Sequence, residues 1–227
     1  MTNSYKPRPE LRPRDLKGIS DDQMSQHWAL YEGYVKNVNL LNDKIKILST
    51  NDYYGAEFAE LKRREGFEYN GMILHELYFA LLRKGRPALK ESSGLAKQLG
   101  KDFGSFESWK KQFIAMGLMR GTGWVILYHD PNRNQLSNFW IKSHEDGHPA
   151  GFNPIVVMDV WEHAYMVDWG TAGRPAYIAA FFENLDWARA ESSFQGAVFS
   201  EQILWLDGKA VDRRIGTGNR RSNRRGE

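Results

Sequence analysis

The spacing of apolar residues changes once along this chain, and the change restricts the folds that the chain can adopt. As far as about residue 84, apolar side chains recur every three or four positions, which is the period of an α-helix. From Trp124 onward they come in short runs rich in β-formers, at 124–129, 138–141 and 155–158. Helices followed by a small antiparallel sheet with further helices make an α+β fold.

The N-terminal part is predicted to be a helical hairpin. Ser20 and Gln23 fit a capping box, so a helix should begin there and continue to about Asp43. Further helices are expected over about 50–63 and from about Gly71 to just before Gly85. The first and last of these helices each carry an apolar face with one histidine. The two faces consist of His27, Tyr31, Tyr34, Val38 and Leu41, and of Met72, His75, Phe79 and Leu82.

Four segments are expected along the chain. They are an extended arm (1–18), a helical hairpin domain (19–88), an α/β C-terminal domain with the antiparallel sheet (89–208) and a basic tail (209–227). The C-terminal domain should hold short helices over 92–118 and a closing helix from Arg174 to about Ser193. The tail has almost no large apolar residue, which predicts disorder.

Composition narrows the classes of protein to which the chain can belong. No run approaches the roughly 18 apolar residues that cross a bilayer, and the first residues do not resemble a secretory signal. The chain has no cysteine, which excludes disulfides, thiolate metal sites and cysteine nucleophiles. We therefore expect a cytoplasmic protein without a membrane span. The arginine pairs of the tail allow weak contact with nucleic acid, and no other nucleic-acid contact is expected.

Three of the six histidines lie where a metal ligand is plausible. His27 and His75 fall on apolar helical faces, where a neutral ring needs a partner. Asp159 directly follows the apolar run 155–158, and His163 comes four residues later. A carboxylate in such a place is costly unless it is paired or binds a metal. Three imidazoles and one carboxylate suit a redox-active iron or manganese ion, and they also suit zinc.

The segment around these last two residues is similar to a known signature. Asp159-Val160-Trp161-Glu162-His163-Ala164-Tyr165 closely resembles the signature of iron/manganese superoxide dismutases. The resemblance covers most of the chain and leaves out only the arm and the tail. Its other landmarks are Leu16 to Ser20 before His27, Tyr34-Val35 with Asn39, Phe67 to Asn70 before His75, Phe103 to Phe106, Gly121 to Trp124, Arg174-Pro175 with Tyr177, and Asn184 with Trp187.

The resemblance implies an enzyme that converts superoxide, a small anion, into oxygen and hydrogen peroxide. One iron or manganese ion per subunit would be held by the four ligands His27, His75, Asp159 and His163, with solvent as the fifth. Tyr34 would stand at the mouth of the substrate channel. Trp124, Trp161 and Gly71 would surround the ligands.

The resemblance also implies a homodimer or a dimer of dimers. Glu162 would cross the interface to His163 of the partner subunit, and Tyr165 would lie at the same interface. The family's gateway histidine is missing, because Leu30 and Tyr31 occupy that stretch. Met166 stands where the partner subunit usually supplies a tyrosine to that histidine, so both halves of the contact are changed together.

The residue that bonds the metal-bound solvent also departs from the common pattern. Iron-type members often supply a glutamine at the position of Gly71, and manganese-type members supply one at about the position of His144. We therefore predict that His144 bonds the solvent. Gly71 points to manganese and a histidine donor points to iron, and we favour iron. His129 and His148 are expected at the surface.

Two other functions stay open. A non-haem iron oxygenase uses two histidines and one carboxylate with open positions, and a third histidine would close a position that it needs. A homologue that binds metal without catalysis is the other alternative, raised by the changed gateway. Superoxide consumption by protein loaded with iron or manganese discriminates among the three.

Overall fold

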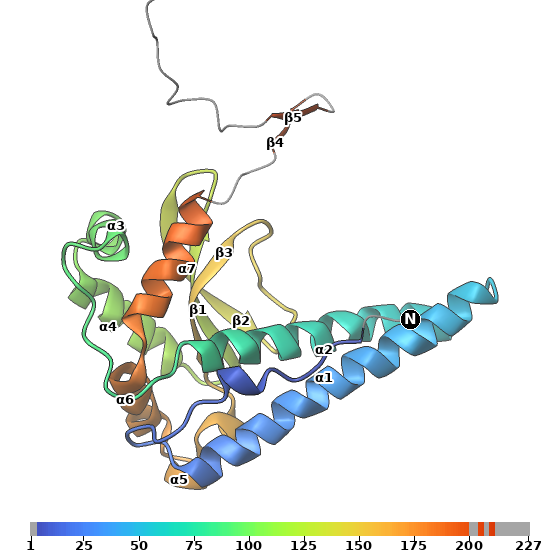
Figure 1. Cartoon of the computed structure of the whole chain (residues 1–227), viewed down its shortest axis with the longest axis horizontal. Coiled ribbons are helices and arrows are strands. Elements are labelled where there is room, and N and C mark those ends of the chain that lie inside the picture. The colour runs from blue at the N-terminus through green and yellow to red at the C-terminus, as the bar shows by residue number, and fades with distance from the viewer. Residues whose placement is uncertain (1–3, 200–203, 207–208, 212–227) are drawn as a thin grey trace, which may run out of the picture.

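The computed structural model describes residues 4–199, 204–206 and 209–211, and it has the predicted α+β architecture (Figure 1). The fold begins with a long antiparallel hairpin of two helices, α1 (Asp21–Thr50) and α2 (Ala56–Ala80). A three-stranded antiparallel sheet and the remaining helices lie beside the end of the hairpin where α1 begins and α2 ends. The tip of the hairpin extends away from them.

Helix α1 starts as predicted and continues beyond the predicted end near Asp43. The Ser20 side chain caps it by accepting a hydrogen bond from the backbone N–H of Gln23 at 3.0 Å. The reciprocal half of the capping box is wrong, because the Gln23 side chain does not return to Ser20. Its amide nitrogen donates to the backbone oxygen of His163 at 2.6 Å, and its oxygen accepts from the N–H of Val167 at 3.0 Å. The start of α1 is thus tied to the segment that carries His163.

Helix α2 is one continuous helix where the sequence predicted two. The predicted break near Gly71 is absent, although an interior glycine costs a helix about 1 kcal/mol. Packing against α1 accounts for both the continuity and the glycine. A Cβ atom at position 71 would lie 2.6 Å from Cδ1 of Tyr34 on α1, so only glycine lets the two helices approach with that ring between them.

From residue 4 onward the arm lies against the hairpin, with a short 3₁₀ turn, η1 (Pro9–Leu11). The backbone of Tyr5 exchanges two hydrogen bonds with the Asn39 side chain, each 2.9 Å long. Further along, the N–H of Arg8 donates to the hydroxyl of Tyr31 at 3.0 Å. These contacts fasten the described part of the arm along α1.

The sheet has the strand order β2-β1-β3, with β1 in the centre and both pairings antiparallel. Its strands are β1 (Gly123–Asp130), β2 (Gln135–Lys142) and β3 (Asn153–Asp159). Two helices precede the sheet, α3 (Gly94–Phe103) and α4 (Phe106–Gly117). After β3 come the 3₁₀ turn η2 (Glu162–Ala164), α5 (Met166–Trp169), α6 (Arg174–Asn184), α7 (Trp187–Phe199) and the paired strands β4 (Leu204–Leu206) and β5 (Lys209–Val211).

Two helices, α6 and α7, replace the single closing helix that the sequence predicted. The chain breaks at Asp186, whose carboxylate accepts hydrogen bonds from the N–H groups of Ala188 and Arg189 at 3.1 and 3.2 Å. These are unpaired donors at the start of α7, so Asp186 caps the new helix. The break also lets Leu185 bridge to Leu82 after the end of α2.

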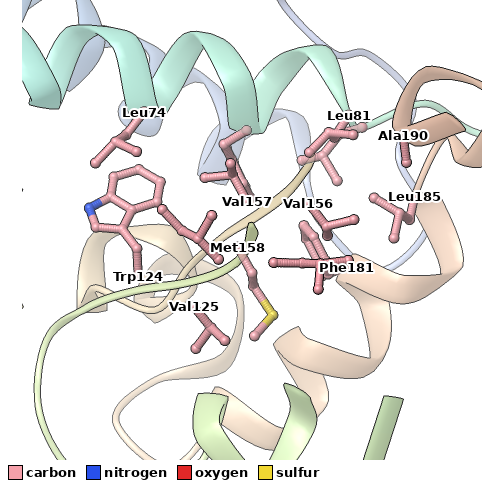
Figure 2. Close-up of a cluster of buried hydrophobic side chains, with 14 of the residues drawn as sticks. Leu74, Leu81, Trp124, Val125, Val156, Val157, Met158, Phe181, Leu185 and Ala190 are labelled. Carbon is pink, nitrogen blue, oxygen red and sulfur yellow. The ribbon is translucent and has the colours of Figure 1, made fainter. Parts of the chain in front are cut away.

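Strand β3 is the part of the fold that carries an acidic residue into the interior. Every residue from Ile155 to Asp159 is buried, which fits a strand covered on both faces. Figure 2 shows the apolar cluster around it, with labelled side chains from α2 (Leu74), the residue that follows α2 (Leu81), β1 (Trp124, Val125), β3 (Val156, Val157, Met158), α6 (Phe181), α7 (Ala190) and the α6–α7 connection (Leu185). Burying one large apolar side chain stabilises the fold by about 1.5–3 kcal/mol. Apolar packing therefore fixes where the Asp159 carboxylate lies.

Within the described residues, no helix has both the length and the apolar character that a membrane crossing requires. Most of the predicted basic tail, from residue 212 to the end, lies outside the described residues. Its first residues, Lys209–Val211, form β5. The four segment boundaries stay predictions.

Gly123, at the start of β1, should be irreplaceable. Its φ of +143° is one that other residues rarely adopt, and an added Cβ would lie 2.1 Å from the backbone oxygen of Ile141. Gly123→Ala should lower the free energy of unfolding by about 2–4 kcal/mol. The matched control is Gly100→Ala on α3, where an added Cβ meets nothing within 4 Å. This substitution should raise the free energy of unfolding by about 0.5–1 kcal/mol. Denaturant unfolding of both variants tests this, and equal stabilities would contradict it.

Candidate metal centre

Four side chains from three separate parts of the chain meet beside the sheet. His27 comes from α1, His75 from α2, and Asp159 and His163 from the end of β3 and the turn η2. One potential ligand atom from each lies within 4.8 Å of those of the other three. The first three residues are buried and His163 is partly exposed. The fold thus brings together the four residues that the sequence singled out.

The cluster centres on a single oxygen atom. Asp159 Oδ2 lies 3.0 Å from His27 Nε2, 3.0 Å from His163 Nε2 and 3.7 Å from His75 Nε2. The other carboxylate oxygen, Oδ1, accepts a hydrogen bond from the backbone N–H of Trp161 at 2.8 Å. That bond fixes the rotation of the carboxylate, so Oδ2 faces the three imidazoles.

The hydrogen bonds of His75 show that the cluster fits a metal ion. Its Nδ1–H donates to the backbone oxygen of Gly71 at 2.6 Å, so its Nε2 carries a lone pair. That Nε2 is buried and has no hydrogen-bond partner among the described residues. A buried, unpaired acceptor is costly, and an ion held among the four side chains would satisfy it. The backbone bond to the remote nitrogen is also how metal-bound histidines are usually oriented.

The electrostatics of the cluster favour the protonation states that bind a metal. Burial lowers the pKa of His27 and lowers the pKa of His75 well below its usual value of 6.5. Burial by itself raises the pKa of Asp159, but the adjacent His163 and the hydrogen bonds from His163 and His27 hold it well below its usual value. Near neutral pH the buried rings are therefore neutral while the carboxylate is charged.

Tyr34 and His144 form a hydrogen-bonded pair next to the four residues. The indole N–H of Trp124 donates to His144 Nδ1 at 3.0 Å, so the ring proton of neutral His144 is on Nε2. His144 Nε2 lies 2.7 Å from the Tyr34 hydroxyl oxygen and donates to it. Burial lowers the pKa of His144 to about 4 and raises the pKa of Tyr34. His144 is thus a neutral donor, and Tyr34 keeps its own hydroxyl proton.

Aromatic rings enclose the site. Trp161 stacks on His163 with centroids 5.7 Å apart and on His144 at 5.1 Å. The rings of Trp124 and His75 pack edge to face, with centroids 5.1 Å apart. The predicted positions of Trp124, Trp161 and Gly71 beside the four residues therefore agree with the geometry, while their roles stay proposals.

Two residues of the site were missed by sequence reasoning. Gln23, with only 1% of its surface exposed, holds the backbone of His163 as described above. Phe67 packs on His144 with ring centroids 4.5 Å apart. A signal for Phe67 was present, because 67, 71, 75 and 79 recur at intervals of four. The predicted break in α2 separated Phe67 from His75 and hid it.

Burial differs among the other predicted residues. Tyr165 is 3% exposed in the single chain and stacks on Tyr177 at 5.6 Å, and its place at a subunit interface stays a prediction. His129, predicted at the surface, is instead 2% exposed because it lies on the central strand β1, and its Nε2 pairs with Asn134 Oδ1 at 2.9 Å. His148 is only partly exposed, and its Nε2 donates to the backbone oxygen of His144 at 2.7 Å. Glu162 is exposed.

The metal-free protein should lose stability as the pH falls. The rings of His27 and His75 take up protons near pH 6.5 when the chain unfolds, but they stay neutral at that pH when folded. Below about pH 6.5 the unfolded state therefore binds more protons than the folded state. Each of the two rings then lowers the free energy of unfolding by up to about 1.4 kcal/mol per pH unit, until the pH reaches the pKa of that ring in the folded state.

Thermal unfolding of the metal-free chain between about pH 8 and pH 5.5 measures this effect. His75→Gln is the matched variant and should show a shallower dependence. An unfolding midpoint that does not fall on acidification would contradict the account.

Comparison with known proteins identifies the family. The model for the C-terminal domain of iron/manganese superoxide dismutases matches residues 91–193. The iron superoxide dismutase of Aquifex pyrophilus is 34% identical over 208 residues, which is 89% of this chain and 96% of that protein. The iron enzyme of Cupriavidus metallidurans is 36% identical over 82% of the chain and 93% of its own length. A manganese superoxide dismutase of Haloferax volcanii is 33% identical over 79% of the chain and 89% of its own length.

The matches span both metal types and most of the chain, and the four clustered residues are those of a mononuclear iron or manganese site. The chain belongs to the iron/manganese superoxide dismutase family and is a superoxide dismutase.

Proposed function

We propose that Tyr34, oriented by His144, supplies protons for superoxide dismutation. This pair lies beside the cluster of His27, His75, Asp159 and His163. Two superoxide ions and two protons become one oxygen molecule and one hydrogen peroxide molecule. When bound, iron or manganese supplies the electron transfer, by accepting an electron from one superoxide and giving it to the next. The observation that carries the proposal is the arrangement of three imidazole nitrogens around Asp159 Oδ2, where the buried Nε2 of His75 has no hydrogen-bond partner among the described residues.

Tyr34 is the proposed proton-bearing group. Both ring nitrogens of His144 are engaged, Nδ1 by Trp124 and Nε2 by Tyr34. A neutral imidazole has one N–H, and here that N–H points to the Tyr34 oxygen. The Tyr34 hydroxyl proton is then available to another acceptor. This differs from the expectation that His144 itself bonds the metal-bound solvent, and it makes His144 the residue that orients Tyr34.

We propose iron as the native metal, with one ion per chain. The histidine at position 144 supports iron. Metal analysis of protein produced with both metals supplied tests the choice. Manganese as the bound metal would overturn it.

A homodimer, alone or paired into a dimer of dimers, is proposed as the working assembly. Leu30 on α1 and Met166 and Trp169 on α5 are exposed apolar residues, and both helices contact the turn η2, which carries the exposed Glu162. His163 keeps 20% of its side chain exposed, so an acidic residue from a partner subunit can reach it. Sedimentation of the full chain tests the assembly, and a monomer that retains full activity would contradict it.

Two further parts of the proposal concern the location of the protein in the cell and its contact with nucleic acid. A cytoplasmic location is proposed, and cell fractionation tests it. Weak contact with nucleic acid by the basic tail stays a prediction, because most of the tail lies outside the described residues.

Metal-free protein reloaded separately with iron and with manganese should consume superoxide with at least one of the two metals. The third imidazole near Asp159 Oδ2 argues against an oxygenase, which needs open positions. A non-catalytic homologue would bind metal and show no turnover. Failure with both metals, in protein that retains one ion per chain, would contradict dismutation and favour that homologue.

Gly71→Ala should lower turnover because it displaces Tyr34. The added Cβ would lie 2.6 Å from the ring of Tyr34, which cannot remain in place. We expect kcat to fall by about tenfold or more while the metal content stays near that of the unchanged protein. The matched control is Gly33→Ala on α1, where a Cβ meets nothing within 4 Å and turnover should be unchanged. Equal turnover by the two variants would contradict the role of Tyr34.

A further inference from the structure

We infer that Tyr128 and His148 form a positioning pair that holds the turn bearing His144, so that the single N–H of His144 meets Tyr34. The inference rests on the proposed role of His144. Neither residue of the pair lies among the four clustered side chains or contacts Tyr34. Their effect on the reaction passes through the backbone of His144.

The hydrogen bonds of the pair run in one direction. His148 Nε2 lies 2.7 Å from the backbone oxygen of His144, and His148 Nδ1 lies 2.7 Å from the Tyr128 hydroxyl. A carbonyl only accepts, so Nε2 carries the proton of the neutral ring. Nδ1 then accepts the hydroxyl proton of Tyr128. The chain of donors therefore runs from Tyr128 through His148 to the carbonyl of His144.

The backbone of the turn that carries His144 makes few other hydrogen bonds within the described residues. The last residue of β2, Lys142, exchanges backbone bonds with Asp146 at 2.9 and 3.2 Å, which closes a tight turn around His144. Within it Ser143 has a φ of +60°, a value that is strained for a residue other than glycine. Among the described residues, the backbone N–H of His144 bonds only to the side chain of the next residue, Glu145, at 3.3 Å. Within the same part of the chain, the bond from His148 is the one that ties the His144 carbonyl to a residue outside this turn.

The other end of the pair is anchored in the sheet. Tyr128 belongs to the central strand β1, is 4% exposed and packs edge-on against Phe139 of β2 with centroids 5.7 Å apart. Trp124 lies four residues earlier on β1, so both side chains leave the same face of the strand. Strand β1 thus holds His144 at two points: Trp124 binds its ring, and Tyr128 reaches its carbonyl through His148.

Two anchors on one rigid strand matter because His144 has a single proton to place. A displacement of about 1 Å is enough to impair a catalytic arrangement. If the carbonyl of His144 moved, its ring could not keep both the bond from Trp124 and the bond to Tyr34.

The test is a double-mutant cycle on the full chain loaded with iron. His148→Leu removes both ring nitrogens, Tyr128→Phe removes only the hydroxyl, and His148→Gln keeps an N–H donor at the position of Nε2. We expect kcat to fall by about tenfold in His148→Leu, by less in Tyr128→Phe, and to recover in His148→Gln. In a His144→Ala background, His148→Leu should change kcat by less than about twofold, because the residue through which it acts is gone.

A second readout does not depend on activity. For this readout the chain is loaded with zinc, a diamagnetic ion that histidine and carboxylate ligands also bind. The rate of hydrogen exchange of the Trp124 indole N–H then reports whether this group still donates a hydrogen bond to His144 Nδ1. Exchange should accelerate by about tenfold in His148→Leu and return toward the original rate in His148→Gln. Trp124→Phe identifies the signal.

The outcomes separate this inference from the proposed role of His144. Unchanged exchange in both His148→Leu and Tyr128→Phe, or an equal loss of kcat with and without His144, would overturn the positioning pair. Unchanged kcat in His144→Ala would overturn the role of His144 itself, and the Trp124 exchange would still decide whether the pair holds the turn. If His148→Leu fails to fold, Tyr128→Phe and His148→Gln carry the test.

Discussion

A single carboxylate oxygen, Asp159 Oδ2, holds together parts of the chain that are far apart in sequence. Helix α1, helix α2 and the turn after β3 each bring an imidazole nitrogen to it, at 3.0, 3.7 and 3.0 Å. The carboxylate reaches this place because apolar side chains bury β3 on both faces (Figure 2). The cost of a buried charge is offset only when partners surround it. The hairpin, the sheet and the C-terminal helices therefore have to meet at this point.

The residues that surround the metal centre lie on the same helices and sheet that bring the four clustered side chains together. On α2, Gly71 accepts the hydrogen bond that orients His75 and also leaves room for the ring of Tyr34. On β1, the Trp124 ring packs edge to face with His75 and donates a hydrogen bond to His144. The order of donors, from Trp124 to His144 to Tyr34, follows from the proton count of a neutral imidazole. Rigid helices and strands thus set the positions of groups that lie on looser segments.

The sequence predicted the fold class and the four clustered residues because each left a local signal. The change in apolar spacing marked the hairpin and the strands, and the motif from Asp159 to Tyr165 marked half of the site. The failures involve contacts that no local pattern records. Gln23 matched a capping box but bonds to the backbone of His163, 140 residues away. His148 looked like a surface residue because its partner, Tyr128, lies 20 residues earlier on the central strand β1. Gly71 looked like a helix break because the sequence does not show the close contact with Tyr34 on α1 that requires a glycine there.

The central claim is that the charge of Asp159, and not the packing around it, makes this cluster a metal centre. Asp159→Asn keeps the size and shape of the side chain and removes the charge. The decisive measurement is the number of iron or manganese ions retained per chain by this variant, together with its rate of superoxide consumption. The account predicts a folded chain that retains little metal and has almost no activity. A variant that retains one ion per chain and the full rate would contradict it.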